Sequence, residues 1–550
     1  MNRFDLVFGG RASSYVPNEG LIVLLCDLMR NLAVLDTKVV VHTTDRHEPF
    51  LRKALAMNGI EPSAVELRAY AVGSAGLNRS AGPQRKRERG RGPLVAFLGR
   101  GARAVASAAR TLLLWNQDIG LGNVFQRALV VPLTALALVL LVIPALAAAV
   151  IGFLLVAGLA VARRLPRVGR RVVPAHRYPA ELRLLTTRLK AFASGIRRDV
   201  DDELYRREQI RLARALNRAR GVDVFFLFSA FEGGLVRALK RPSVIVFPDA
   251  VPMHFPTRFS DAVSTETLRQ MRMAVEHAAG IVCYSEFVRD RQLARLYPEA
   301  ASRKPVAVIP QGYFPARSGD RAARRAAATA RLNAQRDRIA NVFPELLRNR
   351  PVPQFGSFDF VLYPTIDRQH KNVLTLVRAC ARLLRAEHRN VKLVLTTPQA
   401  MPEAHEFIVR ERLHYDVLFM PSVPGDVLDD LCAAATVVVH PSLAEGGDVF
   451  NFSRAVSNGT PALLADIPVV REMFERAGFD RPDFAQTLFD PFDDRALARR
   501  IATVLDDGAP LLAQQTRLLS RLSAYGYPEM AHRYLQFMRK ISNGQAHSSL

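Results

Sequence analysis

The chain has 550 residues, of which 49% are hydrophobic, and its formal net charge is +25 at pH 7. This length exceeds what a single hydrophobic core holds, and the apolar fraction excludes an intrinsically disordered chain, so two or three folded domains are expected. The four cysteines are widely scattered and form no C-x-x-C pair. Their spacing argues against a structural zinc site and a disulfide framework, and it fits a reducing compartment.

The positive charge is concentrated in residues 77–220, which contain 27 Lys or Arg and 8 Asp or Glu. Within this region lies the most apolar stretch of the protein, residues 128–162, which has no charged residue. Basic residues that flank an apolar segment are attracted to anionic lipid headgroups. Because no groove-reading motif accompanies the charge, we expect an anionic membrane surface, and no nucleic acid, as the partner of residues 77–220.

The apolar segment 128–162 is 35 residues long, whereas one membrane-spanning helix needs about 20. Pro144 lies near its middle, where proline breaks or kinks a helix, and arginines crowd both of its ends. Because basic flanks prefer the cytoplasmic face, these features favour a re-entrant helical hairpin bent at Pro144. Two short spans, a single span and a helix pair buried in a soluble domain stay open as alternatives.

Strands alternate with helices before and after this insertion. Residues 4–8 predict a short strand that ends at Gly9 and Gly10, and a helix and a second strand follow. After the insertion the strand pattern resumes with VDVFFLFS, SVIVFPDAVP, AAGIVCYSEF and PVAVIPQG. Such alternation predicts a parallel sheet covered by helices on both faces, which we assign to a first domain of residues 1–315.

A second α/β pattern follows a helical linker, which we assign to residues 316–356. Its expected strands lie in FDFVLYPTIDRQHKN, NVKLVLTTP, DVLFMPSV, TVVVHPSL and TPALLADIP. Helical segments separate them, so residues 357–525 are expected to form a second domain, followed by a C-terminal helix and tail over residues 526–550. The fold class is therefore α/β, with two doubly wound Rossmann-like sheets that bind ligands beyond the carboxyl ends of their strands.

Six motifs carry a resemblance to a known family. They are FPDAVPMHFPTRF, AAGIVCYSEFVRDRQLARLYP, VIPQG, FVLYPTIDRQHKNVLTLVRACARLL, HPSLAEGG and SNGTPALLADIPVVRE. In this order they resemble the retaining glycosyltransferases of family 4 (group 1), in which two Rossmann-like domains face a cleft in the GT-B fold. The resemblance covers residues 222–312 and nearly all of the C-terminal domain, but not the insertion.

The resemblance implies a site for a nucleotide-sugar donor in the C-terminal domain. Glu445 matches the family glutamate that contacts hydroxyl groups of the transferred sugar. A carboxylate suits this task because it accepts hydrogen bonds from two adjacent hydroxyls. Lys371 and Arg368 match the positions that hold the diphosphate, where an ammonium group and a bidentate guanidinium group both fit.

Two glycine pairs are expected to let the backbone approach the ligands closely. Gly446 and Gly447 follow Glu445, where their amides would reach the sugar and the phosphates. Gly9 and Gly10 end the first strand, where the family has a glycine-rich loop near the donor phosphates and the acceptor. A glycine pair after a strand also occurs in ordinary tight turns, so the second assignment depends on the resemblance.

Two positions depart from the family pattern. Arg454 stands where a carboxylate that binds the nucleotide ribose is due, so ribose recognition differs here or Arg454 contacts a phosphate instead. At the end of the strand SVIVF, Pro248 and Asp249 replace a His-Asp pair. Asp249 is the remaining candidate polar group of the catalytic site, and His254 is a nearby alternative.

These features predict a retaining glycosyltransferase at the cytoplasmic face of the inner (plasma) membrane. We expect it to transfer a sugar, mannose by resemblance, from a nucleotide-sugar donor to a lipid-linked or cell-surface glycan precursor. No Asp-x-Asp pair stands out in the expected cleft loops, so neither a metal ion nor a cofactor besides the nucleotide-sugar co-substrate is expected. Pro248 and Arg454 also allow a non-catalytic GT-B protein that serves as a membrane scaffold or regulator of glycan assembly.

Overall fold

The computed structural model describes residues 3–9, 20–61, 64–71, 205–254, 261–335, 354–421 and 423–544. The hairpin predicted over residues 128–162 and the glycine at position 10 lie outside these ranges. Two compact units are distinguished, one formed by Met1–Leu77 with Asp202–Leu550 and the other by Asn78–Asp201. All of the described residues lie in the first unit. None of the helices in its described ranges is both long and apolar enough to cross a membrane.

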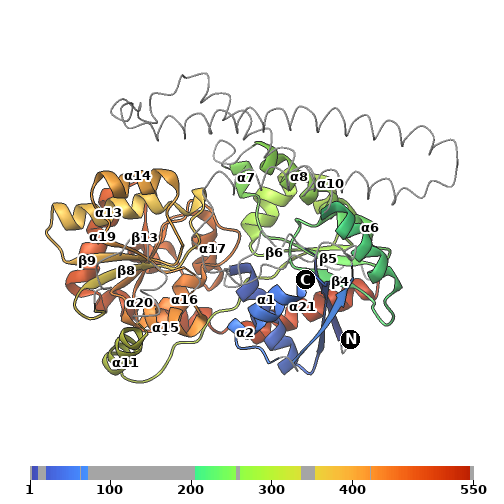
Figure 1. Cartoon of the computed structure of the whole chain (residues 1–550), viewed down its shortest axis with the longest axis horizontal. Coiled ribbons are helices and arrows are strands. Elements are labelled where there is room, and N and C mark those ends of the chain that lie inside the picture. Colours follow the sequence, from blue (N-terminus) through green and yellow to red (C-terminus); the bar gives the residue numbers. More distant parts are fainter. Residues whose placement is uncertain are drawn as a thin grey trace, which may run out of the picture. The chain divides into compact units, whose positions relative to one another are not determined.

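A seven-stranded parallel sheet forms the centre of the N-terminal domain (Figure 1), which confirms the predicted strand pattern. The spatial order is β3-β2-β1-β4-β5-β6-β7, so the chain leaves the sheet at the edge strand β3 and re-enters at its centre with β4. The strands are β1 (Arg3–Phe8), β2 (Lys38–Thr44), β3 (Val65–Tyr70), β4 (Phe225–Leu227), β5 (Ser243–Phe247), β6 (Gly280–Cys283) and β7 (Val306–Val308).

Helices cover both faces of this sheet because alternate side chains of each strand point to opposite faces. In β1, Leu6 packs with helices α1 and α21 on one face, whereas Val7 packs with α6 and α8 on the other. The helices that precede the linker are α1 (Gly20–Val34), α2 (Glu48–Met57), α6 (Gly233–Ala238), α7 (Val251–His254), α8 (Asp261–His277), α9 (Ala294–Leu296) and α10 (Pro298–Arg303). Residues 205–218 are also helical.

A second parallel sheet, of six strands, forms the C-terminal domain in the order β10-β9-β8-β11-β12-β13. Its strands are β8 (Asp359–Tyr363), β9 (Val391–Leu395), β10 (Val417–Phe419), β11 (Val437–His440), β12 (Ala462–Ala465) and β13 (Leu488–Phe489). The surrounding helices are α13 (Val373–Arg385), α14 (Pro402–Arg410), α15 (Gly425–Ala434), α16 (Phe450–Ser457), α17 (Pro468–Arg476), α18 (Arg481–Phe484), α19 (Asp494–Asp507) and α20 (Ala509–Leu522). Two separate Rossmann-like sheets are the hallmark of the GT-B fold expected from the sequence.

Two helices connect the domains. The linker helix α11 (Arg321–Ala334) packs against α15 of the C-terminal domain. The last helix, α21 (Tyr527–Ser542), returns to the N-terminal domain, where it packs beside α1 (Figure 1). The backbone bridge between Tyr313 and Gly526 brings the outgoing and returning segments side by side.

Candidate active site

The turn between β8 and α13 fixes the position of Lys371. Residues Gln369–Lys371 form one turn of 3-10 helix, and Asn372 then adopts a left-handed conformation with φ of 55°. Asparagine tolerates this conformation better than most residues. Its side-chain amide donates hydrogen bonds to the carbonyls of Pro441 (3.1 Å) and Pro491 (2.8 Å). The turn is thereby tied to the loops that follow β11 and β13.

Glu445 accepts two hydrogen bonds on the same carboxylate oxygen, Oε1. Lys371 Nζ lies 2.6 Å from this atom and His440 Nε2 lies 2.9 Å from it. The amide of Asn451 donates to His440 Nδ1 at 3.1 Å and to the carbonyl of Pro364 at 3.0 Å. His440 therefore carries its proton on Nε2 and donates it to Glu445. Within the described residues, Oε2 of Glu445 makes no hydrogen bond.

The charges of this cluster follow from its surroundings. Burial alone would raise the pKa of Glu445, but the Lys371 ammonium and the His440 hydrogen bond outweigh it and hold that pKa well below its ordinary value. Burial lowers the pKa of His440, and the neighbouring Glu445 offsets only part of this effect. At neutral pH the site thus contains an anionic carboxylate, a cationic lysine and a neutral imidazole. The side chain of Glu445 stays 19% exposed, so a ligand has access to it.

Asp249 approaches this cluster from the N-terminal domain. It follows β5, and its Oδ1 accepts a hydrogen bond from the amide of Val251 (3.1 Å) at the start of α7. Burial raises the pKa of Asp249; the Val251 amide lowers it, Glu445 raises it further, and Lys371 lowers it. A Cβ atom on Gly446, the residue after Glu445, would lie 3.1 Å from Cβ of Asp249, so Asp249 lies close to the loop that contains Glu445. Its role in catalysis stays a prediction. The alternative candidate, His254, is exposed at the end of α7.

Gly446 and Gly447 lie where the two domains meet. A Cβ atom on Gly446 would overlap the carbonyl oxygen of Pro248, and one on Gly447 would lie 2.7 Å from Cβ of Tyr284. The hydroxyl of Ser285 donates a hydrogen bond to the carbonyl of Gly446 at 3.0 Å. Both glycines are therefore needed for the close approach of the two domains, a requirement that the sequence did not reveal.

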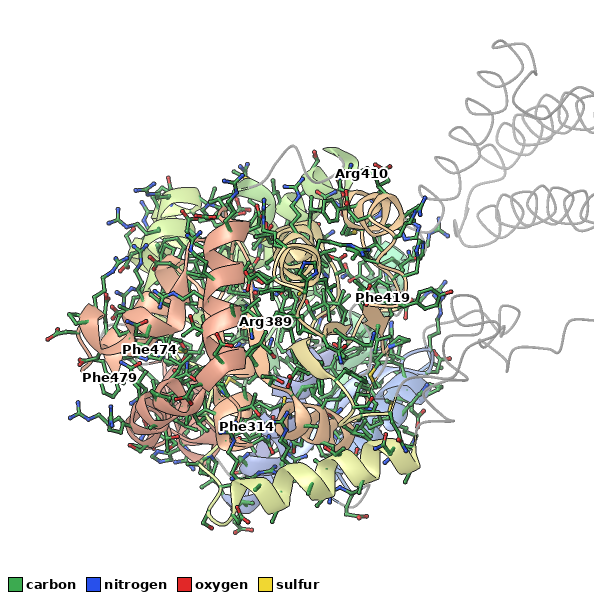
Figure 2. All side chains as sticks on the ribbon, turned by 90° about the vertical axis from the view of Figure 1, so that its left-hand side faces the viewer. Phe314, Arg389, Arg410, Phe419, Phe474 and Phe479 are labelled. Carbon is green, nitrogen blue, oxygen red and sulfur yellow. The ribbon has the colours of Figure 1, made fainter. Side chains whose placement is uncertain are left out.

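Arg454 contacts residues at the domain boundary. Its guanidinium lies 5.0 Å from the centre of the Phe314 ring, and its Nε lies 3.4 Å from Oδ1 of Asp429. Phe314 is labelled in Figure 2. Burial raises the pKa of Asp27 on α1, an effect that Arg30 and Arg454 partly offset. These neighbours account for the position of Arg454, and its contact with the donor stays a prediction.

The remaining predicted donor residues that the structure describes lie in the loops that follow β8 and β1. Arg368 is exposed, and its charge acts on both Asp249 and the buried His370. Gly9 directly follows β1, and a Cβ atom on it would lie 3.2 Å from Oε2 of Glu232, the residue that precedes α6. In the described ranges, no group of three or more His, Cys, Asp or Glu side chains is placed to hold a metal ion.

Several polar residues of this region were not predicted. His440 is the last residue of β11 and Asn451 lies in the first turn of α16, so a polar residue at the end of the strand TVVVH was the available signal. Glu472 of α17 accepts hydrogen bonds from the backbone amides of Glu286 (2.7 Å) and Phe287 (2.8 Å) in the N-terminal domain. No sequence pattern marks a residue whose partners are backbone groups of a distant segment.

Residues 359–507, which extend from β8 to the end of α19, match the family described as Glycosyl transferases group 1. The predicted resemblance to group 1 glycosyltransferases is thus confirmed for the domain that contains Lys371 and Glu445. The chain has the fold of the group 1 glycosyltransferases. No curated protein sequence matches the chain.

Two solved structures with the same fold cover nearly the whole chain. The first is an α,α-trehalose 6-phosphate synthase from Burkholderia multivorans, with 12% identity, a TM-score of 0.50 and coverage of 99% of this chain and 100% of that one. The second is HepE from Anabaena in complex with UDP and glucose, with 13% identity, a TM-score of 0.50 and coverage of 98% and 99%. At these identities the likeness establishes the fold alone.

Proposed function

We propose that the protein is a retaining glycosyltransferase that moves a sugar from a nucleotide-sugar donor to a lipid-linked or cell-surface glycan precursor. The observation that carries this proposal is the Lys371–Glu445 pair at the carboxyl ends of β8 and β11, in the domain that matches group 1 glycosyltransferases. A fixed ammonium group beside an oriented carboxylate suits a ligand that combines a diphosphate with sugar hydroxyls.

Each charged group then has a task in the transfer. Lys371 and Arg368 stabilise the negative charge that develops on the leaving diphosphate, together with backbone amides at the start of α13. Glu445 uses Oε2 to accept hydrogen bonds from hydroxyls of the transferred sugar. The bond from the anomeric carbon to the diphosphate breaks, and the acceptor oxygen bonds to that carbon on the same face. The proton of the acceptor hydroxyl passes to the diphosphate, so no protein nucleophile is needed.

The donor and the site of action belong to the same proposal. The structure of HepE was solved with UDP and glucose, whereas the sequence motifs resemble mannosyl-transferring enzymes, so UDP-glucose and GDP-mannose are the first donors to test. We further propose that transfer needs neither a metal ion nor another cofactor. The basic residues of the segment 77–220 would hold the protein on the anionic cytoplasmic face of the membrane, close to lipid-linked acceptors.

A donor screen tests the proposed activity directly. Purified full-length protein is mixed with labelled nucleotide sugars and lipid-linked acceptors, and binding of UDP and GDP is measured by calorimetry. We expect one nucleotide to bind and its sugar to be transferred, and Glu445→Ala to abolish transfer. Glu406→Ala, a change of an exposed glutamate on α14, serves as the control and keeps the wild-type rate. Undiminished transfer by Glu445→Ala would refute the assignment of Glu445 to the donor site.

The same screen decides between catalysis and the scaffold alternative. A scaffold should bind neither nucleotide, whereas an enzyme binds at least one of the two. Deletion of residues 128–162 tests the membrane assignment, because the shortened protein should leave the membrane fraction and keep its circular-dichroism spectrum. If the shortened protein stays in the membrane fraction, the apolar segment 128–162 is not what anchors it.

A further inference from the structure

A buried carboxyl group without a hydrogen-bonding partner lies at the carboxyl edge of the N-terminal sheet. Glu232 follows β4, directly before α6, and is 1% exposed. Neither of its carboxylate oxygens makes a hydrogen bond of good geometry with the described residues. Burial raises the pKa of Glu232 to about 8, and the nearby Gly9 amide offsets only part of this rise. Near pH 7 the group is mostly neutral, so it is able to donate one hydrogen bond as well as accept others.

The surroundings of Glu232 leave room for this carboxyl group. Strands β1 and β4 are neighbours, and Gly9 is the first residue after β1. A Cβ atom on Gly9 would lie 3.2 Å from Oε2 of Glu232 and 2.9 Å from the side chain of Leu235. Only glycine avoids this crowding. The edge of the sheet thus combines a small residue with a polar group that has no partner.

Gln209 is a second unpartnered polar group at the same place. It belongs to the helical residues 205–218, is 2% exposed, and its Nε2 has no hydrogen-bonding partner in the described part of the chain. Its Oε1 lies 2.5 Å from the position that a Cβ atom on Gly234 would occupy, two residues after Glu232. An amide donor and a carboxyl group therefore both lie beside the first turn of α6.

The adjacent glutamate shows that burial here does not in itself leave polar groups unpaired. Glu208 is also buried, but its carboxylate accepts hydrogen bonds from Thr44 Oγ1 (2.9 Å) and Arg46 Nη1 (3.0 Å). An unpaired buried polar group destabilises the fold because it has lost its hydrogen bonds to water, so two of them at one sheet edge require an explanation. Such groups are typical of sites where a ligand supplies the missing partners.

We propose that Glu232 and Gln209, with space provided by Gly9, form a subsite that binds hydroxyl groups of the acceptor sugar. This inference rests on the proposed glycosyltransferase function, and it assigns acceptor recognition to the N-terminal sheet. A carboxyl group and a carboxamide donate to and accept from neighbouring hydroxyls, which is the chemistry that a sugar ring presents. A neutral carboxyl group also avoids repulsion of the donor diphosphate.

Stability measurements test whether Glu232 serves a ligand or the fold. Thermal unfolding of the full chain is compared for Glu232→Met and for the matched variant Glu208→Met, both without ligand. We expect Glu232→Met to keep or raise the wild-type Tm, because methionine fills the space without an unpaired polar group. Glu208→Met should lower Tm by several degrees, since Thr44 and Arg46 lose their partner. Equal losses in both variants would overturn the proposal.

The pH dependence of stability provides an independent check on the same residue. Because the pKa of Glu232 is raised in the folded state, its contribution to stability is full below about 4.5 and is lost as pH rises through about 8. Glu232→Gln removes this titration. We therefore expect the Tm of Glu232→Gln to exceed that of the wild type by more at pH 8.5 than at pH 5. If the Tm difference between Glu232→Gln and the wild type is the same at both pH values, Glu232 is not an unpartnered carboxyl group with a raised pKa.

Binding measurements test the ligand itself. Saturation-transfer NMR with methyl α-mannopyranoside and methyl β-glucopyranoside is recorded in the presence of UDP or GDP. We expect at least one glycoside to bind the wild type, and Glu232→Met to weaken it at least tenfold while nucleotide affinity stays unchanged. Equal glycoside binding by Glu232→Met, or none by the wild type, overturns the subsite. If no nucleotide binds any variant, the proposed function fails, and the stability comparison still decides the role of Glu232.

Discussion

The carboxyl edges of the two sheets differ in how their polar groups are satisfied. In the C-terminal domain, Lys371 and His440 both donate hydrogen bonds to Glu445, and Asn451 donates one to His440. In the N-terminal domain, Glu232 has no partner in the described residues. The donor side is therefore preorganised before any ligand binds, which favours stabilisation of charge in a transition state. On the proposed acceptor side, Glu232 and Gln209 have unpaired polar atoms that a ligand would be able to satisfy.

The largest expected effect comes from breaking the preorganised pair with Lys371→Met. Loss of the ammonium group should lower the transfer rate about 10³-fold, because one oriented charge contributes about 4 kcal/mol to such a transition state. It should also lower the free energy of unfolding by about 3 kcal/mol, because Glu445 loses its counter-charge. Rates are measured with the donor identified in the screen, and unfolding is followed in denaturant.

Two further variants separate the electrostatic effect from a general loss of structure. Lys371→Met with Glu445→Gln should recover most of the stability but none of the rate, since the unpaired charge is gone. Lys392→Met is the matched control, because Lys392 is a similarly buried lysine that pairs with Asp416 away from the site (3.5 Å). If Lys392→Met lowers the transfer rate as much as Lys371→Met does, the proposal that Lys371 preorganises the donor site is wrong.

The second prediction tests the contact between the N-terminal and C-terminal domains at Gly446. In Gly446→Ala the new methyl group would overlap the carbonyl of Pro248, so the domains must move apart near the site. A displacement of about 1 Å typically costs about 100-fold in rate. Nucleotide binding to the C-terminal domain alone should change little. Gly425→Ala, at the start of α15, is the control, because no atom lies within 4 Å of its added methyl group.

Much of the fold was predictable because the strands are short apolar runs separated by helical patterns. The buried runs VVVH and GIVC each became a strand of a parallel sheet, as the alternation of strands and helices requires. The positions of Glu445, Lys371 and Asp249 were also predictable, since each follows such a strand at the edge of the sheet where Rossmann-like folds bind ligands. Residues that lie at the end of an apolar run and differ sharply from it in polarity are visible without a structure.

The remaining site residues were not predictable because their partners come from distant parts of the chain. Glu232 stands two residues after Ala230 in a stretch that reads as an ordinary loop, and only burial beside Gly9 makes it unusual. The need for glycine at position 446 likewise arises from Pro248, which is nearly 200 residues away in sequence. Such properties depend on how two domains pack, and a one-dimensional pattern does not contain that information.

The third prediction tests how Glu445 is oriented in the donor site, through a residue that does not contact the ligand. Asn451→Leu removes the hydrogen bond that holds His440 with its proton on Nε2. Glu445 should then be less well oriented, and the transfer rate should fall about tenfold, equivalent to about 1.4 kcal/mol. Because Asn451 acts through His440, nucleotide affinity should stay within about twofold. A wild-type rate for Asn451→Leu would show that Lys371 alone orients the carboxylate.

The smallest effect is expected for Glu472→Gln. This change weakens the hydrogen bonds between α17 and the N-terminal domain without altering the carboxyl edge of either sheet. Burial raises the pKa of Glu472, and the amides of Phe287 and Glu286 offset only part of this rise. Its contribution to stability is therefore full below the unfolded pKa and is lost as pH rises through the folded pKa. Glutamine retains one acceptor for the amides and does not titrate. The transfer rate of Glu472→Gln should fall only about threefold. Its Tm should lie below that of the wild type by less at pH 8 than at pH 5. The control Glu475→Gln, which changes an exposed residue, should alter neither the rate nor the Tm.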